Sequence, residues 1–320
     1  MPAKTKFELK MGAATREAFG KALVELGHAN QAIVALDADL SKSTYTHGFA
    51  TAFPERFFEC GIAEANMVAL GAGLASAGKI PFASSFSAFV INKGFEQLRV
   101  TAAYPNVNLK IVGTHSGISI GEDGPSQMSV EDLALACALP GFVVLSPADE
   151  VSMFALIKRA AEHVGPMFVR AGRAKVPVIY DASQEFTIGK SIELIGGTDV
   201  ALIAHGLMVA ESIRASETLE AEGISARVID MHTIKPLDIE AITRAARETG
   251  AIVVSEEHLY DAGLGVRVAQ AASLSHPVPM EFVGLNSYAE SGSPDQLLDK
   301  YGMRAANVVA AARRVLERKR

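Results

Sequence analysis

Short, unbroken apolar segments alternate with amphipathic segments along almost the whole chain, and this alternation restricts the fold more than any other feature. An apolar run without polar alternation is typical of a strand covered on both faces, and intervening helices make such strands parallel. The sequence therefore predicts an α/β fold of mostly parallel sheets with helices on both faces. Strands are expected at 32–38, 56–62, 80–86, 109–115, 142–148, 167–172, 200–206, 225–231, 251–257 and 279–285, and helices at 11–27, 63–78, 87–103, 129–138, 149–164, 207–222, 237–248 and 264–273, followed by two short helices.

The alternation is interrupted between residues 174 and 195, where the sequence is extended and punctuated by proline. A single hydrophobic core seldom grows much beyond roughly 250 residues, and this chain has 320. We expect a linker here between two domains, residues 1–180 and the smaller 190–320.

Charge and cysteine content argue against several classes of function. The 36 acidic and 30 basic residues are scattered along the chain and leave a net charge of −6, so we expect no surface for nucleic acid or for an anionic membrane. Cys60 and Cys137 lie far apart in apolar settings, which argues against a disulfide framework or a cysteine metal site. No apolar stretch of about 20 residues and no signal-peptide run occurs. A cytoplasmic location is expected.

Polar residues gather directly after the expected strands of the first domain. In open parallel sheets, ligands bind outside the carboxyl ends of the strands. The longest of these segments, 113–134, contains four glycines, and loops of this length in compact domains usually carry function. The segments to consider are 39–43, 61–64, 84–89, 115–127 and 170–173.

Three motifs occur together in one order: "GIAEANMVALGAGLASAGKIPFASSFSAFV" at 61–90, "GTHSGISIGEDGPSQMSVEDLA" at 113–134 and "LSPADE" at 145–150. In this order and spacing they resemble the transketolase family of thiamine diphosphate enzymes. The resemblance covers essentially the whole chain, but only the C-terminal half of a full-length transketolase. It implies a pyrimidine-binding thiamine diphosphate fold followed by a transketolase C-terminal-like domain.

One family motif is missing, namely the Gly-Asp-Gly followed by Asn that holds the cofactor's diphosphate and magnesium. The "GEDG" at 121–124 is only superficially similar, because no asparagine lies between Asn108 and Asn286. The resemblance therefore implies one subunit of a split transketolase and no metal ligand in this chain. An N-terminal transketolase subunit would supply the diphosphate and Mg²⁺ (or similar ion) site, and two copies of each subunit are expected.

The resemblance assigns the aminopyrimidine half of thiamine diphosphate to four residues. Glu64 matches the glutamate that hydrogen-bonds a pyrimidine nitrogen and is expected to be catalytic; as a bare pattern, an acid in a first helical turn equally complements the helix dipole. Phe86 and Phe89 match aromatics that stack on the ring. Two phenylalanines that simply pack in the core would give the same sequence pattern. Asp39 matches an acid near the cofactor, or is simply a turn residue.

Further residues are implied to bind the sugar. His115 is expected near the reacting carbon or the phosphate, with a catalytic role, and Asp123 near a sugar hydroxyl. Gln127 stands where many transketolases carry a histidine, which leaves the donor sugar open. The resemblance implies that Arg16, Ser43 and Arg173 bind the distal phosphate, with Arg170 as the alternative to Arg173. Guanidinium groups suit this role because each can pair with two phosphate oxygens.

The implied function is that of a transketolase, which moves a two-carbon ketol unit from a ketose phosphate to an aldose and is active only with its partner subunit. Two alternatives stay open at this point. One is the beta subunit of the thiamine-dependent component of a 2-oxoacid dehydrogenase, which shares the two-domain plan. The other is a non-catalytic regulatory subunit.

Overall fold

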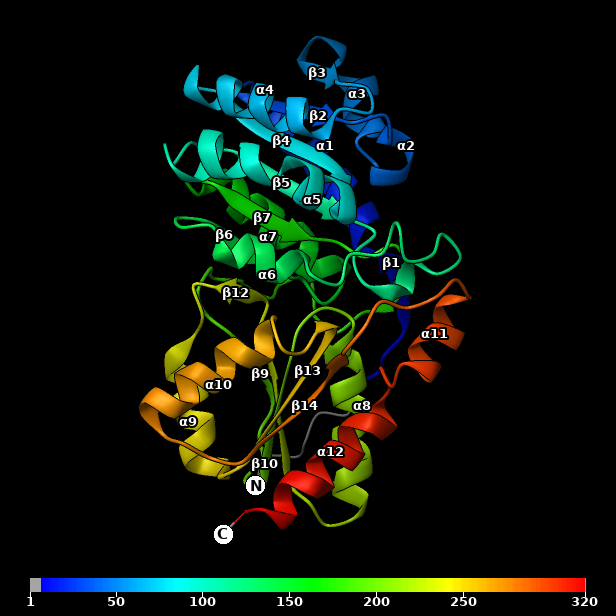
Figure 1. The fold of residues 1–320 in the computed structure, drawn as a ribbon, viewed down its shortest axis with the longest axis vertical. Coiled ribbons are helices and arrows are strands. Elements are labelled where there is room, and N and C mark those ends of the chain that lie inside the picture. Colours follow the sequence, from blue (N-terminus) through cyan, green and yellow to red (C-terminus); the bar gives the residue numbers. More distant parts are fainter. Residues whose placement is uncertain (1–6, 320) are drawn as a thin grey trace.

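The computed structural model describes residues 7–319, which form two large, mostly parallel sheets covered by helices on both faces (Figure 1), together with a small two-stranded sheet. The first sheet has seven strands in the order β12-β6-β7-β5-β4-β2-β3, and the second has five in the order β14-β13-β10-β11-β9. The predicted α/β class with two domains is confirmed. Within residues 7–319, no helix combines the length and apolar character needed to cross a membrane.

The first domain places its polar loops at one edge of the larger sheet. Its strands are β2 (Ile33–Asp37), β3 (Phe57–Glu59), β4 (Ile80–Phe86), β5 (Lys110–Thr114), β6 (Val143–Leu145) and β7 (Met167–Arg170). Its helices are α1 (Thr15–Ala29), α2 (Ser41–Thr44), α3 (His47–Ala52), α4 (Glu64–Ser76), α5 (Ser87–Gln97), α6 (Asp132–Ala138) and α7 (Glu150–Glu162), with short turns η1 (Pro54–Arg56), η2 (Leu98–Ala103) and η3 (Ile118–Ile120).

The second domain repeats the plan on a smaller scale. It contains β9 (Ile192–Ile195), β10 (Val200–Ala204), β11 (Ala226–Asp230), β13 (Ile252–Leu259) and β14 (Met280–Leu285), with helices α8 (Met208–Ala221), α9 (Ile239–Thr249), α10 (Leu264–Ser275), α11 (Pro294–Lys300) and α12 (Ala305–Glu317).

Each face of the two sheets has its own hydrophobic core. One core joins buried residues of α1 and α7 with those of α8 and α12, and the other joins α4, α5 and α6 with α9 and α10. Both cores therefore pass from one domain to the other. The domains pack as one body in which loops of one can fix loops of the other.

Three local expectations were wrong. Residues 11–14 form β1 (Met11–Ala14), not the start of a helix, because they pair antiparallel with β8 (Lys175–Pro177). One of the two short helices expected at the end of the chain, α12, is a full-length helix of 13 residues. The helix expected over 87–103 is present, with its last six residues in a π-helical conformation. In addition, β12 (Thr233–Lys235) leaves the second domain to extend the first domain's sheet beside β6.

Candidate active site

The turn before Glu64 is held by a carboxylate from the preceding strand. Glu59, the last residue of β3, accepts at Oε1 from the backbone N–H groups of Gly61 (3.1 Å) and Asp39 (2.7 Å). Gly61 has φ +67°, a conformation that glycine adopts without steric cost. Helix α4 starts directly afterwards, and its first residue, Glu64, is only 3% exposed. The local sequence thus buries a carboxyl group at the carboxyl edge of the sheet.

The Glu64 carboxylate has one partner among the described residues, the ammonium group of Lys93. Lys93 Nζ lies 3.1 Å from Oε1 and 3.3 Å from Oε2, and the lysine side chain is 49% exposed. The same ammonium sits 4.4 Å from the ring centroid of Phe89. Sequence reasoning missed Lys93, although its spacing of four from Phe89 on one helix would have placed the two side chains together.

An aromatic row continues from this point toward the middle of the sheet edge. The rings of Phe86 and Phe89 are stacked with centroids 5.5 Å apart, and the ring of Phe86 stacks on the imidazole of His115 at 3.7 Å. Phe86 ends β4 and His115 follows β5, so neighbouring parallel strands present them side by side. A buried carboxyl beside such a row fits an aminopyrimidine, which needs a ring-nitrogen partner and a flat apolar surface.

His115 is buried, and its backbone has the rare left-handed conformation with φ +59°. Burial, with Arg16 and Arg173 nearby, lowers the pKa of His115 to about 3, so the imidazole is neutral at pH 7. Arg16 Nη1 lies 3.1 Å from Nε2, which must accept because a guanidinium only donates. The ring proton therefore sits on Nδ1, which is 2.9 Å from the Thr114 hydroxyl.

Arg16 connects His115 to the loop after β2. Its Nη1 also donates to the carbonyl of Ser43 at 2.7 Å, and its guanidinium lies 5.3 Å from the ring centroid of Tyr45. Burial lowers the pKa of Arg16, and the neighbouring Arg173 adds to this effect. Two guanidinium groups held near each other form a positive site suited to a dianionic group.

Arg170 and Arg173, the two candidates for binding the distal phosphate, have different surroundings. Arg170 is buried, its Nε bonds both carboxylate oxygens of Asp132 (3.1 and 2.9 Å), and its Nη2 donates to two backbone carbonyls. Arg173 is 35% exposed and donates to the Ile120 carbonyl at 2.7 Å. Arg173 also forms an ion pair with Glu122 at 3.3 Å, so it is the more exposed of the two arginines but has partners of its own.

The remaining predicted residues lie at the margin. Asp123 is exposed in the loop after β5, close enough to raise the pKa of Arg16. Gln127 is half-buried and accepts from the Ser126 hydroxyl, while the Asp39 side chain is exposed. Within residues 7–319, the structure records no hydrogen bond or ion pair of Asp39 or Gln127 with the other predicted site residues.

Comparison with known proteins identifies the family. A family model described as the transketolase pyrimidine-binding domain matches residues 11–178, and one described as the transketolase C-terminal domain matches residues 189–308. The chain belongs to the transketolase family. Neither a 2-oxoacid dehydrogenase subunit nor a regulatory subunit is favoured by these matches.

Some relatives are single sections of a transketolase. The chain is 43% identical over 306 residues to a putative transketolase C-terminal section of Methanocaldococcus jannaschii, covering 94% of this chain and 95% of that protein. It is 39% identical to the 6-deoxy-6-sulfo-D-fructose transketolase subunit SqwH of Clostridium sp. strain MSTE9, covering 95% of each.

Other relatives are twice as long. The chain is 38% identical to human transketolase, covering 98% of this chain but 51% of that protein, so it spans about half of such relatives. Among solved structures, a split gene transketolase described as an inactive beta4 tetramer is 48% identical, with a TM-score of 0.91 and coverage of 97% of this chain and 100% of that chain. Transketolase from Leishmania mexicana, 23% identical with a TM-score of 0.79, shares the fold.

Proposed function

We propose that this chain is the C-terminal subunit of a split, thiamine diphosphate-dependent transketolase, which moves a two-carbon ketol unit from a ketose phosphate to an aldose. The observation that carries the proposal is the buried Glu64 carboxylate, whose one described partner is a half-exposed lysine beside the aromatic row. A carboxylate so placed is free to exchange that partner for a ligand. Relatives that are themselves single sections or subunits, together with the split gene transketolase structure, support a separate N-terminal subunit.

Thiamine diphosphate, when bound, supplies an electron sink for cleavage of the carbon–carbon bond. In this chain, Glu64 would share a proton with the pyrimidine ring, and a dry environment favours such sharing. Phe86 and Phe89 would cover the ring and exclude water from it. The partner subunit is proposed to bind the diphosphate and its Mg²⁺.

The sugar would lie along the remaining residues of the site. Arg16 and Arg173 are proposed to bind its distal anionic group, with Ser43 beside them. His115 and Asp123 are proposed to orient the hydroxyl groups, with Gln127 and Asp39 at the rim. Because His115 is neutral at pH 7, it can accept or donate a hydrogen bond without carrying charge into the site.

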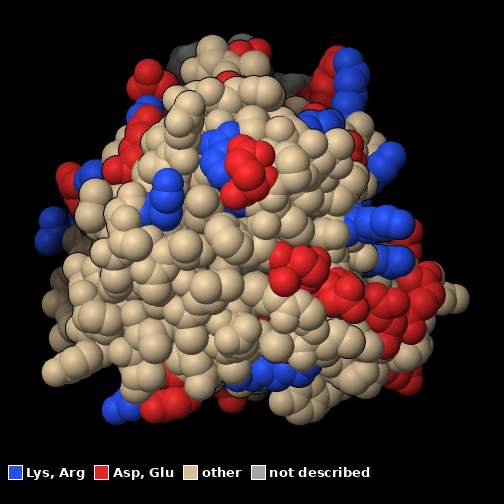
Figure 2. Space-filling model, turned by 90° about the horizontal axis from the view of Figure 1, so that it is seen from above, with Lys and Arg blue, Asp and Glu red and all other residues tan. Residues whose placement is uncertain are grey.

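The proposed assembly contains two copies of each subunit. Two apolar side chains on and beside α4 support a protein contact there, since Ile62 is 77% exposed and Leu70 is 38% exposed. Seen from the end where α3 and α4 lie in Figure 1, broad areas carry no charged side chain (Figure 2). The free thiols of Cys60 and Cys137 support the cytoplasm as the proposed location.

The function is tested by reconstitution. The chain is co-purified with a polypeptide carrying the Gly-Asp-Gly motif and assayed for ketose cleavage with and without thiamine diphosphate and Mg²⁺. Turnover should require both additions, and Glu64→Gln should lower kcat by about a thousandfold or more. Glu25→Gln is the control, because it also removes an ion pair to a lysine, Lys158, but on α1. Equal turnover of the Glu64→Gln and Glu25→Gln complexes would refute the proposal.

The chemical class of the donor is tested in the same complex. The relative from Clostridium is named for a sulfo-sugar, and a guanidinium pair binds either tetrahedral anion. Fructose 6-phosphate and 6-deoxy-6-sulfofructose are therefore compared as donors. The proposal of a sugar phosphate predicts the higher kcat/KM for the phosphate, and the reverse order would replace it with the sulfonate.

A further inference from the structure

The loop between β5 and α6 carries His115, Asp123 and Gln127, and the second domain contacts it at several points. Near its end, the Val130 carbonyl accepts from the Leu259 N–H at 2.9 Å. In its middle, the loop passes so close to the segment before α11 that a Cβ on Gly124 would lie 2.4 Å from the Ser291 hydroxyl oxygen. The conformation of this loop therefore depends on the other domain.

One side chain of the second domain reaches the start of the loop. Glu257, on β13 and 4% exposed, accepts at Oε1 from the Ser119 N–H at 2.6 Å. Its carboxyl group lies flat against Gly117, where a Cβ would be 2.2–2.4 Å from the carboxyl atoms. Gly117 also has φ +80°, so glycine is required there both for space and for conformation. The fit between Gly117 and Glu257 fixes the path of the loop just after His115.

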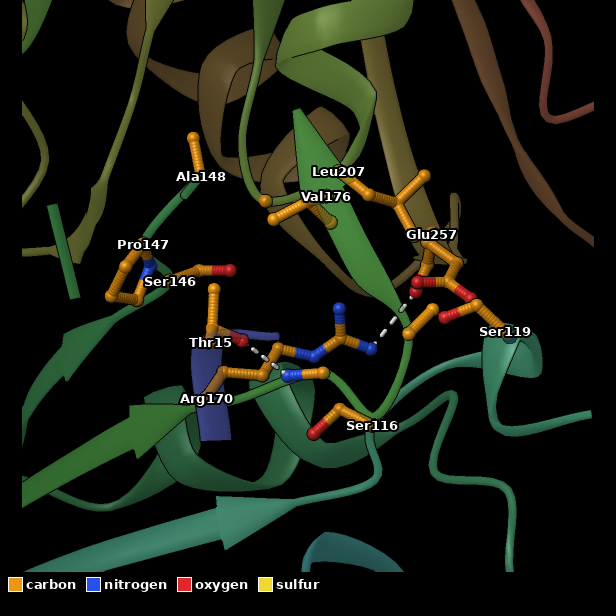
Figure 3. Close-up of a pocket in the computed structure, with 13 residues that line it drawn as sticks. Thr15, Ser116, Ser119, Ser146, Pro147, Ala148, Arg170, Val176, Leu207 and Glu257 are labelled. Atoms are coloured by element: carbon orange, nitrogen blue, oxygen red, sulfur yellow. Dashed lines mark hydrogen bonds between the residues drawn. The ribbon is translucent and has the colours of Figure 1, made fainter. Parts of the chain in front are cut away.

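The backbone of Glu257 is fixed from the first domain. Its carbonyl accepts from Arg170 Nη2 at 2.9 Å (Figure 3). Arg170 is itself held by Asp132 of α6. Arg170, Glu257 and Ser119 border a small cavity of about 30 Å³ between the domains. A cavity of this size holds one or two water molecules.

Keeping this carboxyl in the interior is costly for the fold. Burial raises the pKa of Glu257 to about 7, although Arg170 and the Ser119 N–H both oppose that change. Burial of an acid that no full ion pair compensates adds little to stability by itself. The hydrogen bond of the Glu257 carboxyl goes to a loop N–H, so its contribution is the arrangement of the loop.

We propose that Glu257 is a positioning residue for the substrate loop, holding Ser119 and Gly117 across the domain junction so that His115 and Asp123 face the sugar. The proposal rests on the function proposed above. It assigns the C-terminal domain a direct part in the geometry of a site whose other residues all lie in the first domain.

The test compares Glu257→Met with Glu257→Gln in the reconstituted complex. The methionine removes the acceptor, and the glutamine keeps an oxygen for the Ser119 N–H. Glu257→Met should raise KM for the ketose by about tenfold or more, as expected for a misplaced binding group, without weakening thiamine diphosphate binding. The urea midpoint should also fall, because the buried Ser119 N–H loses its acceptor. Glu257→Gln should restore KM to within about twofold of the unmodified complex.

The control is Glu211→Met, which removes a buried carboxylate of the same domain that accepts from the Ala305 N–H, away from the loop. It should leave KM unchanged. A second readout needs no partner: in the isolated chain, amide exchange of 117–121 should be faster in Glu257→Met only.

Two results would overturn the inference. One is an unchanged KM in Glu257→Met. The other is a raised KM with weaker cofactor binding and lower stability that Glu211→Met reproduces. Failure of the proposed function looks different. In that case the unmodified complex shows no ketose turnover, or Glu64→Gln is fully active, whatever Glu257 does.

Discussion

At the residue scale, Lys93 contacts both groups that we propose bind the pyrimidine, the Glu64 carboxylate and the ring of Phe89. Its ammonium bonds both carboxylate oxygens and covers the ring of Phe89, so both surfaces proposed for the pyrimidine are in contact with one side chain. Lysine is long and half-exposed, and it can move into solvent when a ligand replaces it. The same contact keeps a buried carboxylate paired in the unliganded subunit.

Lys93→Met should therefore tighten binding of thiamine diphosphate to the reconstituted complex. An ion pair with one exposed partner is worth up to about 1 kcal/mol, so the dissociation constant should fall by up to about fivefold. Calorimetric titration measures it directly, with Lys158→Met, which removes the ion pair to Glu25, as the control. A dissociation constant that rises would mean that Lys93 contacts the cofactor instead of competing with it.

At the element scale, helix α7 and the linker share one anchoring residue. Asp149 caps α7 by accepting from the Ser152 N–H at 2.8 Å, and its other oxygen accepts from the Ile179 and Tyr180 N–H groups at 2.8 and 3.0 Å. For comparison, half-buried Ser293 caps α11 by accepting from the Gln296 N–H, a bond within its own helix end. One carboxylate thus ties the start of a helix to the segment that joins the domains.

Asp149→Ala should lower the free energy of unfolding by about 3 kcal/mol or more, because it leaves three N–H groups without their acceptor. Ser293→Ala should lower it by about 1 kcal/mol, the usual value of a lost cap. Urea unfolding followed by circular dichroism gives both values. Equal effects of the two substitutions would show that the bonds to the linker contribute nothing.

At the scale of the whole molecule, several ionisable groups are buried where the domains meet. Burial raises the pKa of Asp230 to about 8, despite the hydrogen bond of 2.5 Å from the Tyr180 hydroxyl. Burial lowers the pKa of His232 to about 4. The acid binds its proton more tightly in the folded state, so its contribution to stability is lost as pH rises through about 8. The histidine acts in the opposite sense, but only below its unfolded pKa of about 6.5.

Between about pH 6.5 and 8.5, Asp230 should lower the free energy of unfolding as pH rises, by up to about 1 kcal/mol per pH unit. Buried Lys110, whose pKa burial lowers to about 7, acts in the opposite direction over the same range. Asp230→Asn keeps an acceptor for the Tyr180 hydroxyl and should remove the negative contribution of this acid from the slope. Asp261→Asn, at an exposed acid, should leave it unchanged. Urea midpoints across this range measure the slope, and an unaltered slope in Asp230→Asn would contradict the prediction.

The sequence by itself determined the two sheets and the edge at which the site lies. Unbroken apolar strands, the turn that buries Glu64 and the pairing of Phe86 with Phe89 are local properties, set by residues a few positions apart. Only the tertiary structure shows that β12 completes the first sheet and that Asp132 pairs with Arg170. It also shows that Glu257 accepts from the N–H of Ser119, 138 positions earlier in the sequence. Such contacts form only when the domains pack against each other, and hydrophobic periodicity carries no information about that packing.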